Sequence, residues 1–156
     1  MNKYVKDHPQ NFAFNQDMIL YRNLKCSIYD YYLYKLNLNH IICFPSITST
    51  SHGESDFEQT TLGAEANKNG FNEKDMINLT LIFNYKHSKD NISPGIIIKN
   101  NTGIDGRTII SAHPNENEVI LFPFTFARIK KIDEKTENEI RKHTITFDII
   151  NRKEYI

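Results

Sequence analysis

The stretch Glu-Asn-Glu-Val-Ile-Leu-Phe at residues 116–122 places two carboxylates immediately before an apolar run. The apolar run predicts a strand, in which side chains alternate between the two faces. Glu116 and Glu118 are two positions apart, so in a strand they lie on the same face and can act on one bound ligand. The stretch therefore predicts a site with two carboxylates. The alternative is that charges at the entry of a strand serve only solvation.

Two other segments carry polar side chains in or beside predicted strands. Arg22 stands inside the apolar stretch 18–24, which reads as a strand. The run Ser49-Thr50-Ser51 closes an extended segment that is rich in hydroxyl groups. Each feature alone is common, because a strand arginine often pairs with a carboxylate and hydroxyls often follow a strand.

Arginine, then Ser-Thr-Ser, then Glu-x-Glu, in this order and on three predicted strands, resembles the mono-ADP-ribosyltransferases of the arginine-serine-glutamate type. These include vertebrate ecto-enzymes and clostridial binary toxins. The resemblance extends over residues 18–132 and includes the run Val-Ile-Leu-Phe-Pro-Phe-Thr-Phe after Glu118. It implies an α+β fold, with two small antiparallel sheets around an NAD cleft and a few helices. It also implies an enzyme that uses NAD as substrate, releases nicotinamide and transfers ADP-ribose to a protein, with an exposed arginine as the expected acceptor.

The resemblance also implies roles for individual residues. Glu118 would steady the positive charge that develops on the nicotinamide ribose as the glycosidic bond breaks. Glu116 would hold the acceptor guanidinium and take a proton from it; the alternative is a surface carboxylate beside a turn. Arg22 would bind the phosphate and ribose portion of NAD. Ser49 would support Glu118 and the ribose, and Thr50 and Ser51 extend this NAD-binding group.

Two departures from the family pattern affect the expected NAD site. The family usually has glycine after its strand arginine, where the backbone holds the nicotinamide amide, whereas this chain has Asn23. The backbone donor and acceptor remain, and asparagine tolerates unusual dihedral angles. The family also places an aromatic residue after Ser-Thr-Ser to stack on nicotinamide. Phe57 is the nearest candidate, with a place in the core as the alternative.

Length, net charge and cysteine content limit the domain organisation and the kinds of partner and site that the chain can have. At 156 residues the chain fits one domain, which we expect at residues 18–156 after an N-terminal arm or lead-in at 1–17. The 19 basic and 19 acidic residues cancel, which disfavours nucleic acid as a partner. Neither of the 2 cysteines forms a close pair with histidine, so neither a zinc site nor a disulfide framework is indicated.

The first residues carry charges where a signal peptide needs an apolar run, and no segment approaches the roughly 20 apolar residues of a membrane span. The expectation is a soluble chain, cytoplasmic or exported by a route without a classical signal peptide. The oligomeric state and the target protein are not predicted.

Periodicity and turn signals predict the remaining elements. Residues 27–36 predict an amphipathic helix with Ser27 as its N-cap. Residues 77–86 alternate between apolar and polar side chains and predict a strand. The other predicted elements are a helix at 56–68, strands at 40–46, 96–99, 107–111 and 144–150, a strand over 118–132 interrupted near Pro123, and a charged turn at 134–142.

Two rival functions remain open. In an NAD glycohydrolase, water replaces the protein acceptor. A non-catalytic binding module would retain the fold without the reaction, and Asn23 slightly favours that alternative. The family commonly carries more helical sequence ahead of the strand arginine, so the expectation from the resemblance is either a minimal enzyme or an excised catalytic core.

Overall fold

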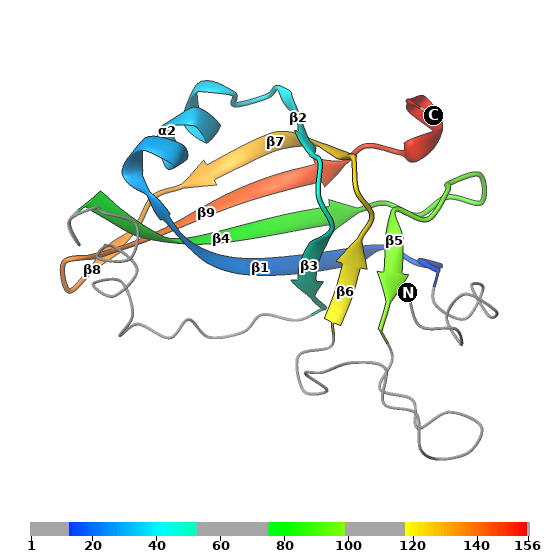
Figure 1. Cartoon of the computed structure of the whole chain (residues 1–156), viewed down its shortest axis with the longest axis horizontal. Coiled ribbons are helices and arrows are strands. Elements are labelled where there is room, and N and C mark those ends of the chain that lie inside the picture. Colours follow the sequence, from blue (N-terminus) through cyan, green and yellow to red (C-terminus); the bar gives the residue numbers. More distant parts are fainter. Residues whose placement is uncertain (1–12, 53–74, 99–117, 156) are drawn as a thin grey trace, which may run out of the picture.

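The computed structural model describes residues 13–52, 75–98 and 118–155 (Figure 1). The sequence-predicted helix at 56–68 and strand at 107–111 lie outside these ranges. The elements, in chain order, are β1 (Met18–Ser27), α2 (Ile28–Leu36), β2 (Ile41–Phe44), β3 (Thr48–Ser51), β4 (Met76–Tyr85), β5 (Gly95–Ile97), β6 (Glu118–Leu121), β7 (Thr125–Asp133), β8 (Thr136–Glu137), β9 (Ile140–Ile149) and the 3-10 helix η5 (Arg152–Glu154).

The strands form one hydrogen-bonded path in the order β2-β7-β9-β4-β1-β3-β6-β5, and β8 pairs with β9. The long strands β1, β4, β9 and β7 lie side by side, whereas β3, β6 and β5 run across their direction (Figure 1). The two parts meet where Tyr21 of β1 pairs with Ser51 of β3, the one residue pair in the β1–β3 register. This junction turns the sheet from one strand direction to the other.

The predicted α+β class is confirmed, but the sheets differ from the expectation in two respects. The two expected small sheets are joined by the Tyr21–Ser51 pair into a single path. The pairing is also not antiparallel throughout, because β4 and β9 run parallel. A parallel pair needs a long crossover connection, and here the chain passes through β5, β6, β7 and β8 before it returns beside β4.

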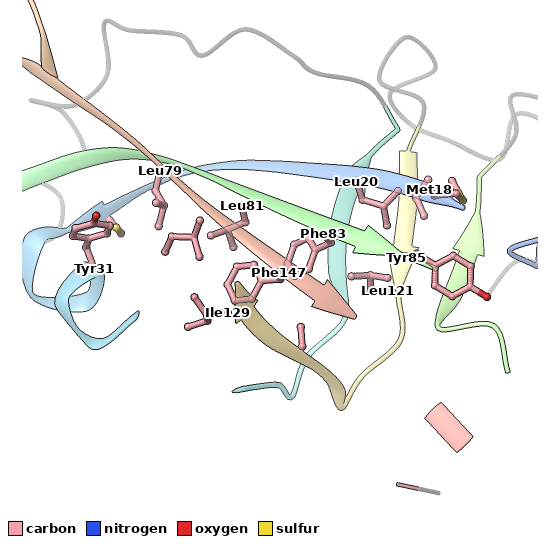
Figure 2. Close-up of a cluster of buried hydrophobic side chains, with 14 of the residues drawn as sticks. Met18, Leu20, Tyr31, Leu79, Leu81, Phe83, Tyr85, Leu121, Ile129 and Phe147 are labelled. Atoms are coloured by element: carbon pink, nitrogen blue, oxygen red, sulfur yellow. The ribbon is translucent and has the colours of Figure 1, made fainter. Parts of the chain in front are cut away.

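One hydrophobic core serves both parts of the sheet. Every second residue of β4 from Ile77 to Tyr85 is buried, as the alternating sequence predicts. Phe83 stacks on Phe147 of β9 with ring centroids 5.1 Å apart, and Leu121 of β6 joins the same cluster from the short strands (Figure 2). Because β4 and β6 share this core, a slip in either register would expose apolar side chains to water.

The predicted helix is confirmed as α2, which lies over one end of the long strands (Figure 1). The Ser27 hydroxyl accepts a hydrogen bond from the backbone N–H of Asp30 at 3.2 Å, so it caps the helix as expected. Tyr31 is 2% exposed and packs into the core from the inner face of the helix. Together with the half-buried Ile28 and Tyr34, this buried aromatic side chain packs α2 against the sheet.

Residues 13–17, the described end of the expected lead-in, contact the sheet. Phe14 is buried and meets Tyr85 edge to face, with ring centroids 5.0 Å apart. Its backbone N–H donates to Ser93 Oγ at 3.0 Å. The Asp17 carboxylate accepts from the backbone N–H of His87 at 2.7 Å, and this bond is the main cause that lowers the pKa of Asp17.

The charged segment 134–142, predicted as a solvated turn, is a β-hairpin instead. Thr136 pairs with Arg141 and Glu137 with Ile140, which leaves Asn138 and Glu139 as a two-residue loop. Both loop residues have positive φ, 50° and 66°, as a tight hairpin of this length requires. The turn was not predicted because Glu139 occupies the second loop position, where glycine is usual.

Candidate functional site

Arg22 lies where β1 and β3 diverge, one residue beyond the Tyr21–Ser51 pair. Its guanidinium Nη1 donates to the backbone carbonyl oxygen of Ser49 at 2.9 Å. The side chain leaves β1 on the face that also carries Leu20 and Leu24 and is half-buried. Arg22 thus bridges the gap between the two parts of the sheet.

The guanidinium of Arg22 has donors to spare. Within the described residues the Ser49 carbonyl is its hydrogen-bond acceptor, and no carboxylate forms an ion pair with it. An arginine has five N–H donors in a planar fork, a geometry that matches phosphate oxygens. The structural alternative, an arginine neutralised by a carboxylate, is therefore not found in this part of the chain.

The Ser-Thr-Ser run forms β3 and alternates between two faces. Thr48 and Thr50 are buried, whereas Ser49 is exposed and Ser51 is half-buried. The buried Thr50 Oγ1 donates to the backbone carbonyl of Val119 in β6 at 2.7 Å. This hydrogen bond connects β3 to β6 on the buried face of the sheet. The Thr50 hydroxyl therefore does not lie on the same face as Ser49 and Ser51.

Ser51 and Glu118 are directly opposite in the antiparallel β3–β6 pair, and Ser49 is opposite Ile120. Opposite residues share a face of the sheet, with Cβ atoms about 5 Å apart. The half-buried Glu118 thus lies on the same face as both serines. Residues 67 positions apart in the chain are thus brought together beside Tyr21. The Arg22 side chain leaves β1 on the other face and reaches this group through the backbone carbonyl of Ser49.

Asn23 follows Arg22 in β1, so its side chain lies on the face of Tyr21 and not on the face of Arg22. There its Oδ1 accepts a hydrogen bond from Thr80 Oγ1 of β4 at 2.9 Å. Its backbone is regular strand, paired with Thr80. Glu116 and Phe57 lie outside the described residues.

Two further residues lie beside the junction that the sequence pattern did not indicate. Tyr21 is the cross-strand partner of Ser51, so Tyr21, Ser51 and Glu118 form a row across β1, β3 and β6. Tyr34 of α2 lies near Arg22; burial raises the pKa of Tyr34, and the positive charge of Arg22 partly opposes that rise. The signal for Tyr34 is its spacing of three residues from the buried Tyr31.

Two kinds of feature do not occur in the described part of the chain. No helix there has the length and apolar character to cross a membrane. Nor do three or more histidine, cysteine or carboxylate side chains gather there in a way that could hold a metal ion.

Comparison with solved structures identifies the fold as that of ADP-ribosyltransferases. The matches include the ADP-ribosyltransferase Vis of Vibrio splendidus (16% identity, 90% of this chain and 51% of Vis, TM-score 0.50). They also include HopU1 of Pseudomonas syringae pv. tomato DC3000 (19% identity, 88% of this chain and 47% of HopU1, TM-score 0.54). C3larvin toxin of Paenibacillus larvae matches at 10% identity over 94% of this chain and 73% of the toxin, with a TM-score of 0.57. The expected ADP-ribosyltransferase-like fold is therefore confirmed.

The likeness is confined to the fold. No protein-family model and no curated protein sequence matches the chain. The chain spans about half the length of Vis and HopU1.

Proposed function

We propose that this chain is a mono-ADP-ribosyltransferase domain that uses NAD, releases nicotinamide and transfers ADP-ribose to an exposed arginine of a protein acceptor. The observation that carries the proposal is the junction of β1, β3 and β6. There Arg22 contacts the backbone of Ser49, and Ser51 lies opposite Glu118. The ADP-ribosyltransferase fold supports the same reaction.

In this proposal Arg22 binds the diphosphate and ribose of NAD. Its hydrogen bond to the Ser49 carbonyl holds the guanidinium in place, and the N–H donors that have no acceptor among the described residues are available to oxygen ligands. A half-buried position strengthens these contacts, because the local dielectric constant is lower than that of water. The backbone of Asn23 would hold the nicotinamide amide, and Phe57 would stack on the nicotinamide ring.

Glu118 is the proposed catalytic carboxylate. When the bond between the ribose C1′ and the nicotinamide nitrogen breaks, the leaving nicotinamide takes the electron pair and the ribose becomes oxocarbenium-like. A fixed carboxylate beside the ribose stabilises that positive charge. The hydroxyls of Ser49 and Ser51, on the same face as Glu118, would orient the carboxylate and the ribose.

The second half of the reaction requires an acceptor. A guanidinium nitrogen of the target arginine forms the new bond to C1′ and must lose a proton as it does so. We propose that the Glu116 carboxylate accepts this proton. If the strand of Glu118 continued back to residue 116, the two carboxylates would lie on the same face. If water takes the place of arginine, the same site makes free ADP-ribose, which is the glycohydrolase alternative.

Incubation with labelled NAD and an arginine-rich protein tests the proposal. The unaltered chain should label the protein and release nicotinamide in equal amounts. Glu118→Gln should lose both products by about 100-fold or more, by analogy with removal of one preorganised electrostatic partner. Glu116→Gln should keep part of the nicotinamide release but lose labelling.

The possible results separate the three functions. Free ADP-ribose without labelled protein would indicate a glycohydrolase. Binding of NAD without cleavage would indicate a non-catalytic module. Full activity of Glu118→Gln would remove the proposed site altogether.

A further inference from the structure

A recess is lined by residues of α2 and of the β8–β9 hairpin. These elements lie at the end of the long strands away from β3 and β6 (Figure 1). The volume of the recess is about 400 Å³, and its polar lining includes Tyr32, Lys35, Glu134, Thr136, Arg141 and His143. None of these residues belongs to the β1–β3–β6 junction. The recess therefore has no part in the reaction proposed above.

The carboxylate of Glu134 is neutralised inside the recess. Lys35 Nζ lies 2.5 Å from Glu134 Oε1, and the Tyr31 hydroxyl donates to the same oxygen at 3.0 Å. The hydrogen bond from Lys35 is the largest cause that lowers the pKa of Glu134, and the bond from Tyr31 is the second. The anion of the recess is thus already matched by a cation.

Arg141 has no such match. It is half-buried, and among the described residues no side chain or backbone group forms a hydrogen bond or ion pair with its guanidinium. Arginine keeps its charge at every physiological pH, so the guanidinium cannot become neutral by losing a proton. A partly desolvated cation without a partner is unfavourable unless a ligand supplies the anion.

Two neutral hydrogen-bond donors lie on the same face of the hairpin as the Arg141 guanidinium. Thr136 is the cross-strand partner of Arg141, so its hydroxyl lies on the same face. His143 follows two residues after Arg141 on that face, and its Nδ1 accepts from the backbone N–H of Lys135 at 3.1 Å. A neutral ring whose Nδ1 accepts carries its proton on Nε2, which makes Nε2 a donor. Burial lowers the pKa of His143, so the ring is neutral at pH 7.

We propose that this recess binds a phosphate group, either as the free ion or on a small phosphorylated molecule. The planar fork of Arg141 takes two phosphate oxygens, and the Thr136 hydroxyl and the His143 N–H supply donors to the others. The Lys35–Glu134 pair also lines the recess, and because its two charges match, it repels the anion little. A carboxylate has only two oxygens and would use fewer of these donors.

The test is a titration of the ¹⁵N-labelled chain with inorganic phosphate, phenyl phosphate and acetate at constant ionic strength, followed by amide shifts. We expect saturable shifts at Thr136, Arg141 and His143, with a dissociation constant for phosphate on the order of 1 mM. Acetate should bind several-fold more weakly. Tighter binding of phenyl phosphate than of the inorganic ion assigns the recess to a phosphorylated molecule, and equal binding assigns it to the ion.

Two variants and a matched control locate the binding. Arg141→Gln should weaken phosphate binding by about tenfold or more, because it removes the only unmatched charge of the described lining. Thr136→Val, on the exposed hairpin, should weaken binding by roughly threefold through one lost hydrogen bond. Lys130→Gln removes the same charge from the exposed side of β7, outside the recess, and should leave binding unchanged. Absence of saturable shifts, or equal binding by Arg141→Gln and Lys130→Gln, would overturn the proposal.

Discussion

Arg22 and Arg128 make the same kind of contact from different strands, so they form a matched pair for mutation. Arg22 Nη1 donates to the Ser49 carbonyl at 2.9 Å, and Arg128 Nη1 donates to the Asn39 carbonyl at 2.7 Å. Arg22→Lys keeps the charge but replaces the planar fork by a single ammonium group. We expect kcat/KM for NAD to fall about tenfold or more, mainly through a higher KM, because phosphate contacts act in the ground state and the transition state alike.

Initial rates of nicotinamide release over a range of NAD concentrations provide the measurement. Arg128→Lys should retain the full rate, since Arg128 lies on β7 and contacts no residue of the junction. If both variants are equally impaired, the effect is a general loss of stability and not a loss of NAD binding.

The two cysteines differ in their surroundings and should differ in reactivity. Cys26 is buried at the end of β1, and this burial raises the pKa of its thiol to about 11, with a smaller contribution from Asp30. Cys43 is exposed on β2. Only the thiolate reacts with iodoacetamide, so at pH 8 we expect Cys43 to be alkylated and Cys26 to remain unmodified until the chain unfolds.

Mass spectrometry of peptides from folded and denaturant-treated protein measures both sites at once. Cys43→Ser should abolish labelling of the folded chain. Rapid labelling of Cys26 in the folded Cys43→Ser variant would mean that the end of β1 opens readily.

At the scale of the elements, Thr50 connects β3 to β6 and so sets the position of Glu118 relative to Ser51. Its buried hydroxyl donates to the Val119 carbonyl at 2.7 Å. Thr50→Val keeps the shape but leaves that bond unmade, which should lower the free energy of unfolding by about 1 kcal/mol. We also expect a lower rate of nicotinamide release at temperatures where the variant is fully folded, because the β3–β6 pair becomes less rigid.

Urea unfolding and initial rates measure the two effects separately. Thr146→Val is the control, since Thr146 is half-buried on β9 and its hydroxyl has no hydrogen-bond partner among the described side chains and backbone groups. A rate unchanged in Thr50→Val would show that the β3–β6 register alone is sufficient to position Glu118.

The elements themselves follow closely from local sequence. The alternating residues of β4 predict a strand at 77–86, and the structure has Met76–Tyr85. The Ser27 cap predicts the start of α2 to the residue. The β8–β9 hairpin could not be predicted, because its turn uses Asn138 and Glu139 in place of a glycine-containing pair, and its ion pairs at Glu137 form only once the strands are aligned.

At the scale of the whole molecule, the order of three motifs predicts the fold, but contacts between distant segments decide the site. Ser51 and Glu118 are paired by the register of β3 and β6, which the order of the motifs along the chain does not specify. The contact between Arg22 and Ser49 was not predictable, because the acceptor is a backbone carbonyl and any residue at position 49 would supply it. The parallel β4–β9 pair likewise depends on how the whole chain packs, and no local pattern distinguishes it from an antiparallel pair.

The shared core makes a prediction about how the molecule unfolds. Phe83 of β4 stacks on Phe147 of β9 and meets Phe44 edge to face at 5.2 Å, in the same buried cluster as Leu121 of β6. Phe83→Ala should therefore cost about 3–5 kcal/mol, a large part of the stability of a domain of this size. Because the long and the short strands rest on one cluster, we expect them to lose stability together.

Native-state hydrogen exchange distinguishes joint from separate unfolding. In Phe83→Ala the amides of Leu79 in β4 and of Val119 in β6 should lose equal amounts of opening free energy, since both open only when the whole core opens. Ile19→Ala, at a side chain 49% exposed on β1, should change the free energy of unfolding by no more than about 0.5 kcal/mol. If Val119 keeps its protection while Leu79 loses it, the short strands form an independent unit. The Tyr21–Ser51 pair would then act as a hinge between two units, and the distance from Arg22 to Glu118 would not be fixed by the core.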